Sequence, residues 1–139
     1  MHTRISENTL IIRMTSGKLP SLPFVRIKDH ILGKNYELSL VFPTLQKSIE
    51  LHKQFKKKNT PVNILSFPLA KNEGEIYITL SAARKECKNF SLTYHEYLQY
   101  LFIHGCVHLL GNDHGDVMDA LENKFCKKFT IAYPYKKHE

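Results

Sequence analysis

The stretch VNILSFPLAKNEGEIYITL, residues 62–80, contains two short runs rich in β-branched and aromatic residues. Val62–Phe67 and Glu75–Thr79 are both typical of strands, and the segment KNEG between them has the composition that turns favour. From Leu80 onward the apolar residues recur at helical spacing instead. The stretch therefore predicts two close strands at the point where the chain changes from strands to helices.

Strands and helices alternate on the amino-terminal side of this stretch, whereas helices alone follow it. The other expected strands are Thr9–Met14 and Tyr36–Phe42, which brings the total to about four. The expected helices are Leu22–Leu32 ending at Gly33, a segment from Pro43 to about Phe55, and segments at about Ser81–Lys88, Leu92–Leu110 and Val117–Thr130. A strand-rich first half and a helical second half indicate an α+β fold.

The composition bounds the class of protein. The chain has 139 residues, of which 42% are hydrophobic, so residues 1–139 are expected to form a single domain with one core. No apolar stretch approaches the roughly 20 residues that a membrane helix needs. The first residues, MHTRISENTLIIRM, lack the features of a secretory signal, which favours a cytoplasmic location. Three widely spaced cysteines without a CxxC pair suggest neither a disulfide framework nor a zinc finger.

The chain is basic, with 20 Lys and Arg against 13 Asp and Glu and a formal net charge of +7. Lysines cluster at Lys56–Lys58 and near the carboxyl terminus. Such clusters favour contact with nucleic acid, although a solvated lysine-rich surface explains any one of them equally well.

The segment HGCVHLLGNDH, residues 104–114, has the spacing of metal ligands. His104 and His108 are four residues apart on an expected helix, so both imidazoles leave the same face and can converge on one ion. Gly111 is suited to ending the helix, which would let the chain turn and bring His114 back toward the pair. Three imidazoles leave a fourth position open on a tetrahedral metal, which is typical of a catalytic site.

Two other interpretations of the histidines stay open at this point. Their spacing could be accidental in a chain with eight histidines. It is also the spacing of the zinc protease motif HExxHxxGxxH, but Gly105 stands where those proteases carry the glutamate that acts as general base. Peptide hydrolysis is therefore disfavoured.

Several linked motifs resemble the YbeY family of bacterial endoribonucleases, also called rRNA maturation factors. HGCVHLLGNDH is similar to the family pattern HGxLHLxGYDH, and NILSFP at 63–68 resembles its T(D/N)VLSFP. GEIYI at 74–78 resembles GDIxI, and Met118 with Glu122 matches a family spacing after the last histidine. The likeness covers roughly residues 51–126.

The resemblance implies a small mixed sheet of about four strands packed against helices, with a zincin-like metal site at His104, His108 and His114. It implies one divalent metal ion, with zinc the first candidate and nickel or another transition metal the alternatives. The implied activity is cleavage of single-stranded RNA in 16S rRNA 3′-end maturation and ribosome quality control, with the ribosome or ribosomal proteins as partners. No membrane association is implied.

The family also has a basic residue, usually arginine, in the loop before the LSFP strand, where it faces the metal across a cleft. Lys56 aligns with it and is expected to contact the phosphate that is cleaved, although Lys57 or Lys58 could do so instead. Asp113 is retained and would either orient a histidine or form the turn. Asn63 and Ser66 are candidates for the wall of the cleft and, equally, ordinary strand and turn residues.

Four further residues are expected to lie outside the site. Cys106 is about 200° around the helix from His104, so Cys106, like Met118, is expected in the core. His52 and His95 lack partners at ligand spacing and are expected to be structural or surface residues. The competing functions are therefore a metal-dependent RNA hydrolase, a non-catalytic RNA-binding or ribosome-associated factor with a structural metal, and, less favoured, a metalloprotease.

Overall fold

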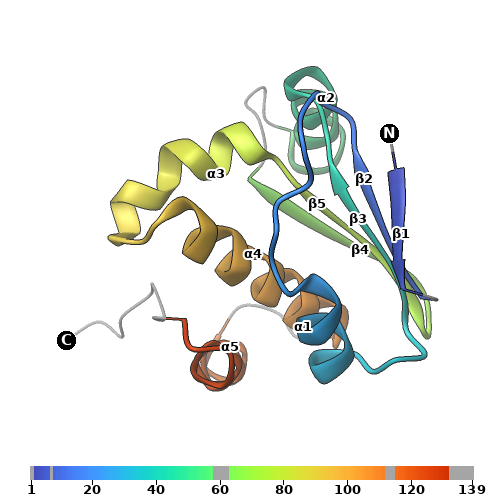
Figure 1. The fold of residues 1–139 in the computed structure, drawn as a ribbon, viewed down its shortest axis with the longest axis vertical. Coiled ribbons are helices and arrows are strands. Elements are labelled where there is room, and N and C mark those ends of the chain that lie inside the picture. Colours follow the sequence, from blue (N-terminus) through green and yellow to red (C-terminus); the bar gives the residue numbers. More distant parts are fainter. Residues whose placement is uncertain (1, 7, 58–62, 112–114, 132–139) are drawn as a thin grey trace.

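The computed structural model describes residues 2–6, 8–57, 63–111 and 115–131. The strands are β1 (His2–Ser6), β2 (Thr9–Arg13), β3 (Glu37–Phe42), β4 (Ile64–Ala70) and β5 (Glu73–Ile78). The helices are α1 (Phe24–Ile31), α2 (Leu45–Lys56), α3 (Leu80–Glu86), α4 (Tyr94–Leu109) and α5 (Asp116–Lys128), with a 3-10 turn at Cys87–Phe90. This is a mixed α+β fold, as the sequence predicts (Figure 1).

The five strands form one sheet in the order β1-β2-β3-β5-β4. β2, β3 and β5 are parallel, whereas β1 and β4 are the antiparallel edges. The four expected strands are all present, but the expected total of about four is one too low because β1 extends the sheet beside β2. Its sequence, HTRIS, has no alternation of apolar and polar residues, since an edge strand need not bury a continuous face.

Helices cover both faces of the sheet, and the alternation along β4 shows which helix covers which face. Leu65 packs with Leu51 of α2 in a small separate cluster, joined by Phe67 and Tyr77. Ile64 and Ser66 instead face α4 on the opposite side. α1 packs against α4 and also against the sheet, where the Phe24 ring lies 6.1 Å from that of Phe42 in β3, whereas α5 packs against α4 (Figure 1).

α4 is the central helix of the fold. Its buried residues lie around most of its circumference, and several are completely inaccessible, among them Leu98, Phe102 and Val107. Such a helix is stabilised by packing on several sides rather than by one apolar stripe. Thr93 begins it with a capping box, since its hydroxyl accepts from the Glu96 amide while the Glu96 carboxylate accepts from the Thr93 amide. The histidine pair is therefore carried on a rigid element.

Most of the predicted helix ends are confirmed. α1 ends just before Gly33 and α4 just before Gly111, and both glycines have positive φ, at 96° and 97°.

The turn between β4 and β5 is shorter than the expected KNEG, because strand pairing continues to Ala70 and Glu73 and leaves Lys71 and Asn72 between the strands. Among the described segments, no helix is both long and apolar enough to cross a bilayer.

The cysteines are buried, as expected for Cys106, and Met118 is also in the core at 1% exposure. Burial raises the pKa of the Cys126 thiol from 9.0 to about 12, and the neighbouring Glu122 carboxylate adds to the shift. Burial also raises the pKa of Cys106. Both thiols therefore stay protonated in the folded protein at neutral pH.

We expect Cys106 and Cys126 to react slowly with a thiol reagent at pH 8 in the folded protein, and all three cysteines to react at once in guanidinium. An unfolded thiol ionises near pH 9, whereas the Cys126 thiol of the folded protein ionises only near pH 12. The contribution of Cys126 to the free energy of unfolding is therefore fully present below pH 9 and is lost as the pH rises from 9 to about 12. Mass spectrometry of the labelled chain gives the count at each position. Rapid labelling of Cys126 under native conditions would contradict the buried placement.

Candidate metal centre

His104 and His108 lie one turn apart on α4, as their spacing predicts. Their ring centroids are 4.7 Å apart with an interplanar angle of 82°. The His104 side chain is 15% exposed, and His108 is also partly exposed, whereas the residues between them are buried. The two imidazoles are thus accessible polar groups near the carboxyl-terminal end of α4, where the residues between them are buried.

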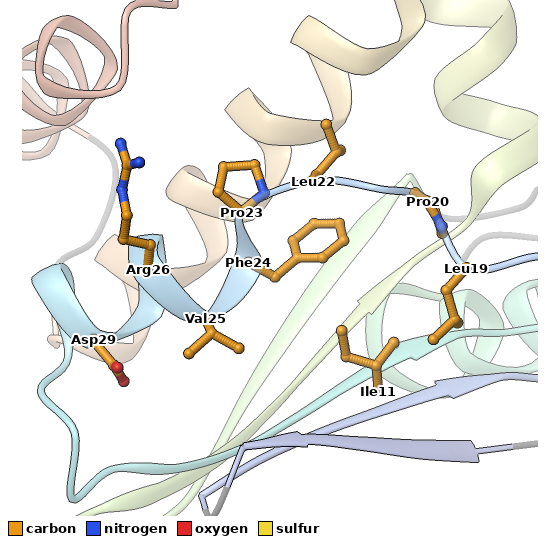
Figure 2. A pocket seen from close by; sticks show the side chains of 9 residues that line it. All are labelled: Ile11, Leu19, Pro20, Leu22, Pro23, Phe24, Val25, Arg26 and Asp29. Carbon is orange, nitrogen blue, oxygen red and sulfur yellow. The ribbon is translucent and has the colours of Figure 1, made fainter.

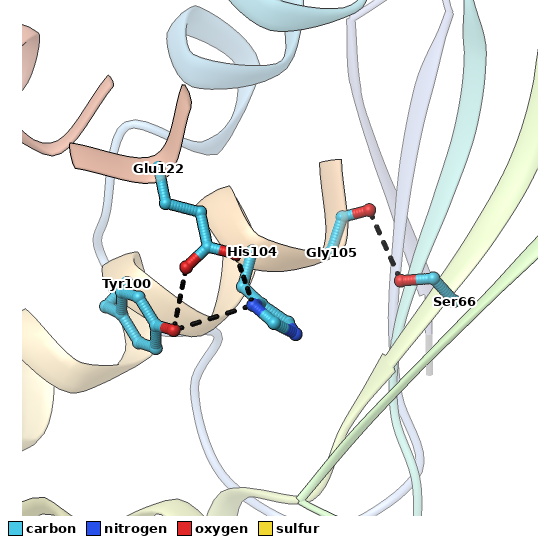
Figure 3. Close-up of polar contacts among 5 residues, drawn as sticks. All are labelled: Ser66, Tyr100, His104, Gly105 and Glu122. Atoms are coloured by element: carbon cyan, nitrogen blue, oxygen red, sulfur yellow. Dashed lines mark hydrogen bonds and ion pairs between the residues drawn. The ribbon is translucent and has the colours of Figure 1, made fainter. Parts of the chain in front are cut away.

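A buried carboxylate on α5 holds His104. Nδ1 of His104 lies 2.7 Å from Oε2 of Glu122, and the Tyr100 hydroxyl donates to Oε1 of the same carboxylate at 2.9 Å (Figure 3). Glu122 is 2% exposed, so these two bonds satisfy a charge that burial would otherwise destabilise. The Tyr100 hydroxyl also lies 3.5 Å from His104 Nδ1.

This contact determines which nitrogen of His104 can bind a metal. An Nδ1 that donates to a carboxylate carries the proton, so Nε2 carries the lone pair. Figure 3 shows Nε2 on the side of the ring away from Glu122. A carboxylate behind a ligating histidine is the usual arrangement in metal sites, because it fixes the ring and makes the imidazole a stronger donor. The described residues therefore fit a metal site.

The sequence motifs indicated Asp113, not Glu122, as the residue that orients a histidine. The only signal for Glu122 was its family spacing with Met118, which does not reveal a contact. Met118, Glu122 and Cys126 are four residues apart on α5, and all three are buried. A carboxylate in the middle of a buried helical stripe is unusual. The position of Glu122 in this stripe is therefore the signal that it contacts another buried polar group.

The side chains of three expected site residues are not described. His114 and Asp113 lie outside the described residues, and the side chain of Lys56 is likewise not described. Lys56 was expected in the loop after α2, but the helix continues through it and ends at Lys57, which has a φ of 56°. Within the described ranges, no cluster of three or more potential metal ligands occurs. The three-histidine site stays a prediction.

Asn63 and Ser66 both make structural contacts. The Ser66 hydroxyl donates to the Gly105 carbonyl at 3.3 Å (Figure 3). The Asn63 amide donates to Glu86 at 3.1 Å, and its oxygen accepts from the Ile64 amide at 2.7 Å. Both side chains therefore connect β4 and its start to the helices.

Gly105 allows α4 to approach the sheet closely. A Cβ at this position would lie 3.0 Å from Cδ1 of Ile76, 3.1 Å from Cδ1 of Ile64 and 3.1 Å from the Ser66 hydroxyl. A side chain at position 105 would therefore point into the contact with β4 and β5. The glutamate of the protease motif has no room here, which further weakens the protease interpretation.

We expect Gly105→Leu to lower the free energy of unfolding by about 1–3 kcal/mol, because the extra carbons overpack the contact with Ile64 and Ile76. Urea unfolding followed by circular dichroism measures the change. Ala120→Leu, at an exposed position of α5, is the matched control and should change stability by less than about 0.5 kcal/mol. Equal midpoints for the two variants would contradict the close packing.

Two cavities lie apart from His104 and His108. One, of about 440 Å³, is mainly apolar and lies between Ile11 of β2, the segment before α1, and α1 itself (Figure 2). The other, of about 650 Å³, is lined by residues of the segment after β2 and of α2, α3 and α4. Neither His104 nor His108 lines either cavity.

Comparison with known proteins agrees with the motifs. The family model described as endoribonuclease YbeY matches residues 23–130. The endoribonuclease YbeY of Zymomonas mobilis subsp. mobilis is 30% identical over 137 residues, covering 83% of this chain and 78% of that protein. The endoribonuclease YbeY of Francisella tularensis subsp. novicida is 32% identical over 137 residues, covering 87% of this chain and 83% of that protein.

A solved structure shares the fold. A Thermotoga maritima protein determined in solution aligns with a TM-score of 0.57 at 22% sequence identity, covering 86% of this chain and 91% of that one. At this identity the match supports the arrangement of the sheet and helices.

Proposed function

Because this chain belongs to the YbeY family of endoribonucleases, we propose that it hydrolyses single-stranded RNA with the help of a metal held by its histidines. The chain is accordingly an enzyme of the hydrolase class that acts on phosphodiester bonds. The proposed role is 16S rRNA 3′-end maturation and ribosome quality control in the cytoplasm, with rRNA and the ribosome or ribosomal proteins as partners.

The contact between His104 and Glu122 is the observation that carries the metal dependence. A histidine with Nδ1 held at 2.7 Å by a buried carboxylate is prepared to present Nε2, and His108 lies beside it. A histidine with a purely structural role could form the same hydrogen bond to Glu122. Such a role would not require His108 beside it on the same partly exposed face of α4. The two histidines together therefore favour a ligating role.

The proposed ligands are His104, His108 and His114, and the ion is one divalent metal, with zinc the first candidate and nickel or another transition metal the alternatives. Such an ion supplies Lewis-acid stabilisation of charge on the phosphate and lowers the pKa of bound water. Asp113 is proposed to orient His114 or to shape its turn. Glu122 and Tyr100 hold His104 in place while RNA is bound.

The basic side chains are proposed to bind and position the RNA backbone. Lys56, at the end of α2, would contact the scissile phosphate and stabilise the negative charge that develops on it. A lysine supplies this charge without the two-pronged geometry of an arginine, so it positions the phosphate less strictly. The net charge of +7 adds a general attraction for RNA that weakens with salt.

The second candidate function is an RNA-binding or ribosome-associated factor in which the metal is structural. The rigid, mostly buried setting of α4 is compatible with it. It predicts RNA or ribosome binding without turnover. The protease alternative has no such support, because position 105 faces the sheet.

Metal removal and replacement separates these functions. Protein purified free of contaminating nuclease is treated with a chelator, then restored with zinc or nickel, and each sample is incubated with single-stranded RNA, double-stranded RNA and casein. The hydrolase predicts cleavage of single-stranded RNA that is lost on chelation and returns with metal. RNA binding without cleavage in every sample would favour the binding factor, and metal-dependent casein hydrolysis would favour the protease.

A further inference from the structure

The cavity of about 650 Å³ is lined by cationic side chains without an acidic one. The cations are Arg13 of β2, Lys18 of the segment after β2 and Arg84 of α3, and His95 adds an imidazole from the first turn of α4. Hydroxyl-bearing residues also line it, namely Thr15, Ser21, Ser81 and Tyr94. A concave surface with convergent cations and hydroxyl groups is the chemistry that recognises phosphate.

The segment after β2 is built around Arg13. Its guanidinium donates to the Thr15 hydroxyl at 3.1 Å and to the Lys18 carbonyl. The chain passes so close that a Cβ at Gly17 would lie 2.9 Å from the guanidinium, and Gly17 has a φ of 119°, which side chains disfavour. The segment is therefore held in a defined shape at the wall of the cavity.

Arg84 is held by a contact with α4. Its guanidinium carbon lies 4.0 Å from the centre of the Tyr94 ring, a cation–π contact that orients the group without using its N–H donors. Among the described residues Arg84 makes no ion pair. The nearest acidic residue of the first turn of α4, Glu96, accepts from the Thr93 amide and does not line the cavity. The positive charge is thus not neutralised locally.

The cavity is distinct from the candidate metal centre. His95 and His104 are nine residues apart on α4, which is about two and a half turns and places them on opposite faces. We propose that this cavity is a phosphate-binding site, with Arg84 and Lys18 as the charged contacts. The phosphate comes either from a single-stranded RNA, which would then be held at a second point, or from a free phosphate compound. The assignment of the phosphate to RNA rests on the proposed function, whereas the phosphate-binding site itself does not.

The first arm of the test uses inorganic phosphate. We expect orthophosphate, added at constant ionic strength against chloride, to shift the amide NMR signals of residues 15–19 and of Ser21, and the ring signals of Tyr94 and His95, in a saturable way. Arg84→Gln should abolish these shifts, and Lys18→Gln should weaken them. Lys85→Gln is the matched control, because it removes the same charge from the neighbouring exposed residue of α3, which does not line the cavity.

The second arm uses a 2′-O-methyl oligouridylate, checked for integrity after each titration. If the phosphate belongs to RNA, Arg84→Gln should weaken binding about tenfold and reduce the slope of log affinity against log salt by about 0.7, while Lys85→Gln should leave both nearly unchanged. Equal RNA affinities together with the orthophosphate shifts would assign the site to a free phosphate compound.

The proposal is overturned if orthophosphate shifts none of these signals in the wild-type protein, or if the shifts persist in Arg84→Gln. Because the first arm needs neither RNA nor metal, its result is independent of whether the chain cleaves RNA. Thermal melts of each variant show whether the fold is retained, and Lys18→Gln, on a different wall, repeats the test if Arg84→Gln unfolds.

Discussion

Replacing both His104 and His108 by alanine is expected to remove the bound metal and to lower single-stranded RNA cleavage about a thousandfold. The two imidazoles lie side by side with centroids 4.7 Å apart, so their loss would leave at most His114 of the proposed ligand set. A metal at the reacting phosphate supplies several kcal/mol of charge stabilisation, and about 4 kcal/mol corresponds to a thousandfold in rate. This is the largest effect that the site predicts.

Metal content by mass spectrometry and RNA cleavage should be measured on the same preparations. His52→Ala is the matched control, because His52 lies on α2 and lacks a histidine at ligand spacing. The control should retain about one metal per chain and full activity. Metal retained in the double variant would contradict the ligand assignment, and metal lost with cleavage unchanged would contradict the hydrolytic role of the ion.

Replacing Glu122 is expected to weaken metal binding about 10- to 100-fold without removing any ligand, because residues that hold a ligating histidine have effects of this size. In Glu122→Ala, His104 Nδ1 and the Tyr100 hydroxyl both lose the carboxylate that accepts from them. Removing the acceptor of a buried hydrogen bond costs about 1–3 kcal/mol of folding free energy. The alanine variant is therefore expected to be less stable as well.

Glu122→Gln separates the two effects. It keeps the shape of the side chain but can present an N–H to Nδ1, which would move the proton of His104 to Nε2 and block ligation. We expect weaker metal binding with a smaller change in stability than in Glu122→Ala. Competition against a chromophoric chelator measures the affinity, and urea unfolding measures the stability.

Two comparisons make the result specific. Tyr100→Phe removes one bond to the same carboxylate but leaves the contact between His104 and Glu122, so it should affect the metal less. Asp119→Asn removes a charge from an exposed position of α5 and should leave the affinity unchanged. If Glu122→Gln bound metal as tightly as the wild type, Glu122 would be a structural residue without influence on the site.

Local signals in the chain predict most of the fold. The β-branched runs that become β2 to β5 and the glycines that follow α1 and α4 act over a few residues, so their effect can be read directly from the order of residues. β1 was missed because its pairing with β2 leaves no periodic pattern in HTRIS. The pairing of β3 with β5, which brings Leu40 beside Ile76, is equally invisible locally because 36 positions separate the two residues.

The same division applies to the candidate site. The spacing of His104 and His108 determines that both leave one face of a helix, since the helical repeat acts within four residues. The contact of His104 with Glu122 spans 18 residues and exists because α5 packs across α4 with its buried stripe facing that helix. His95, expected at the surface or in a structural role, lines a cationic cavity for the same reason, since Arg13, Arg84 and His95 come from three separate elements. Local chemistry thus specified which groups could act, and long-range packing decided which of them meet.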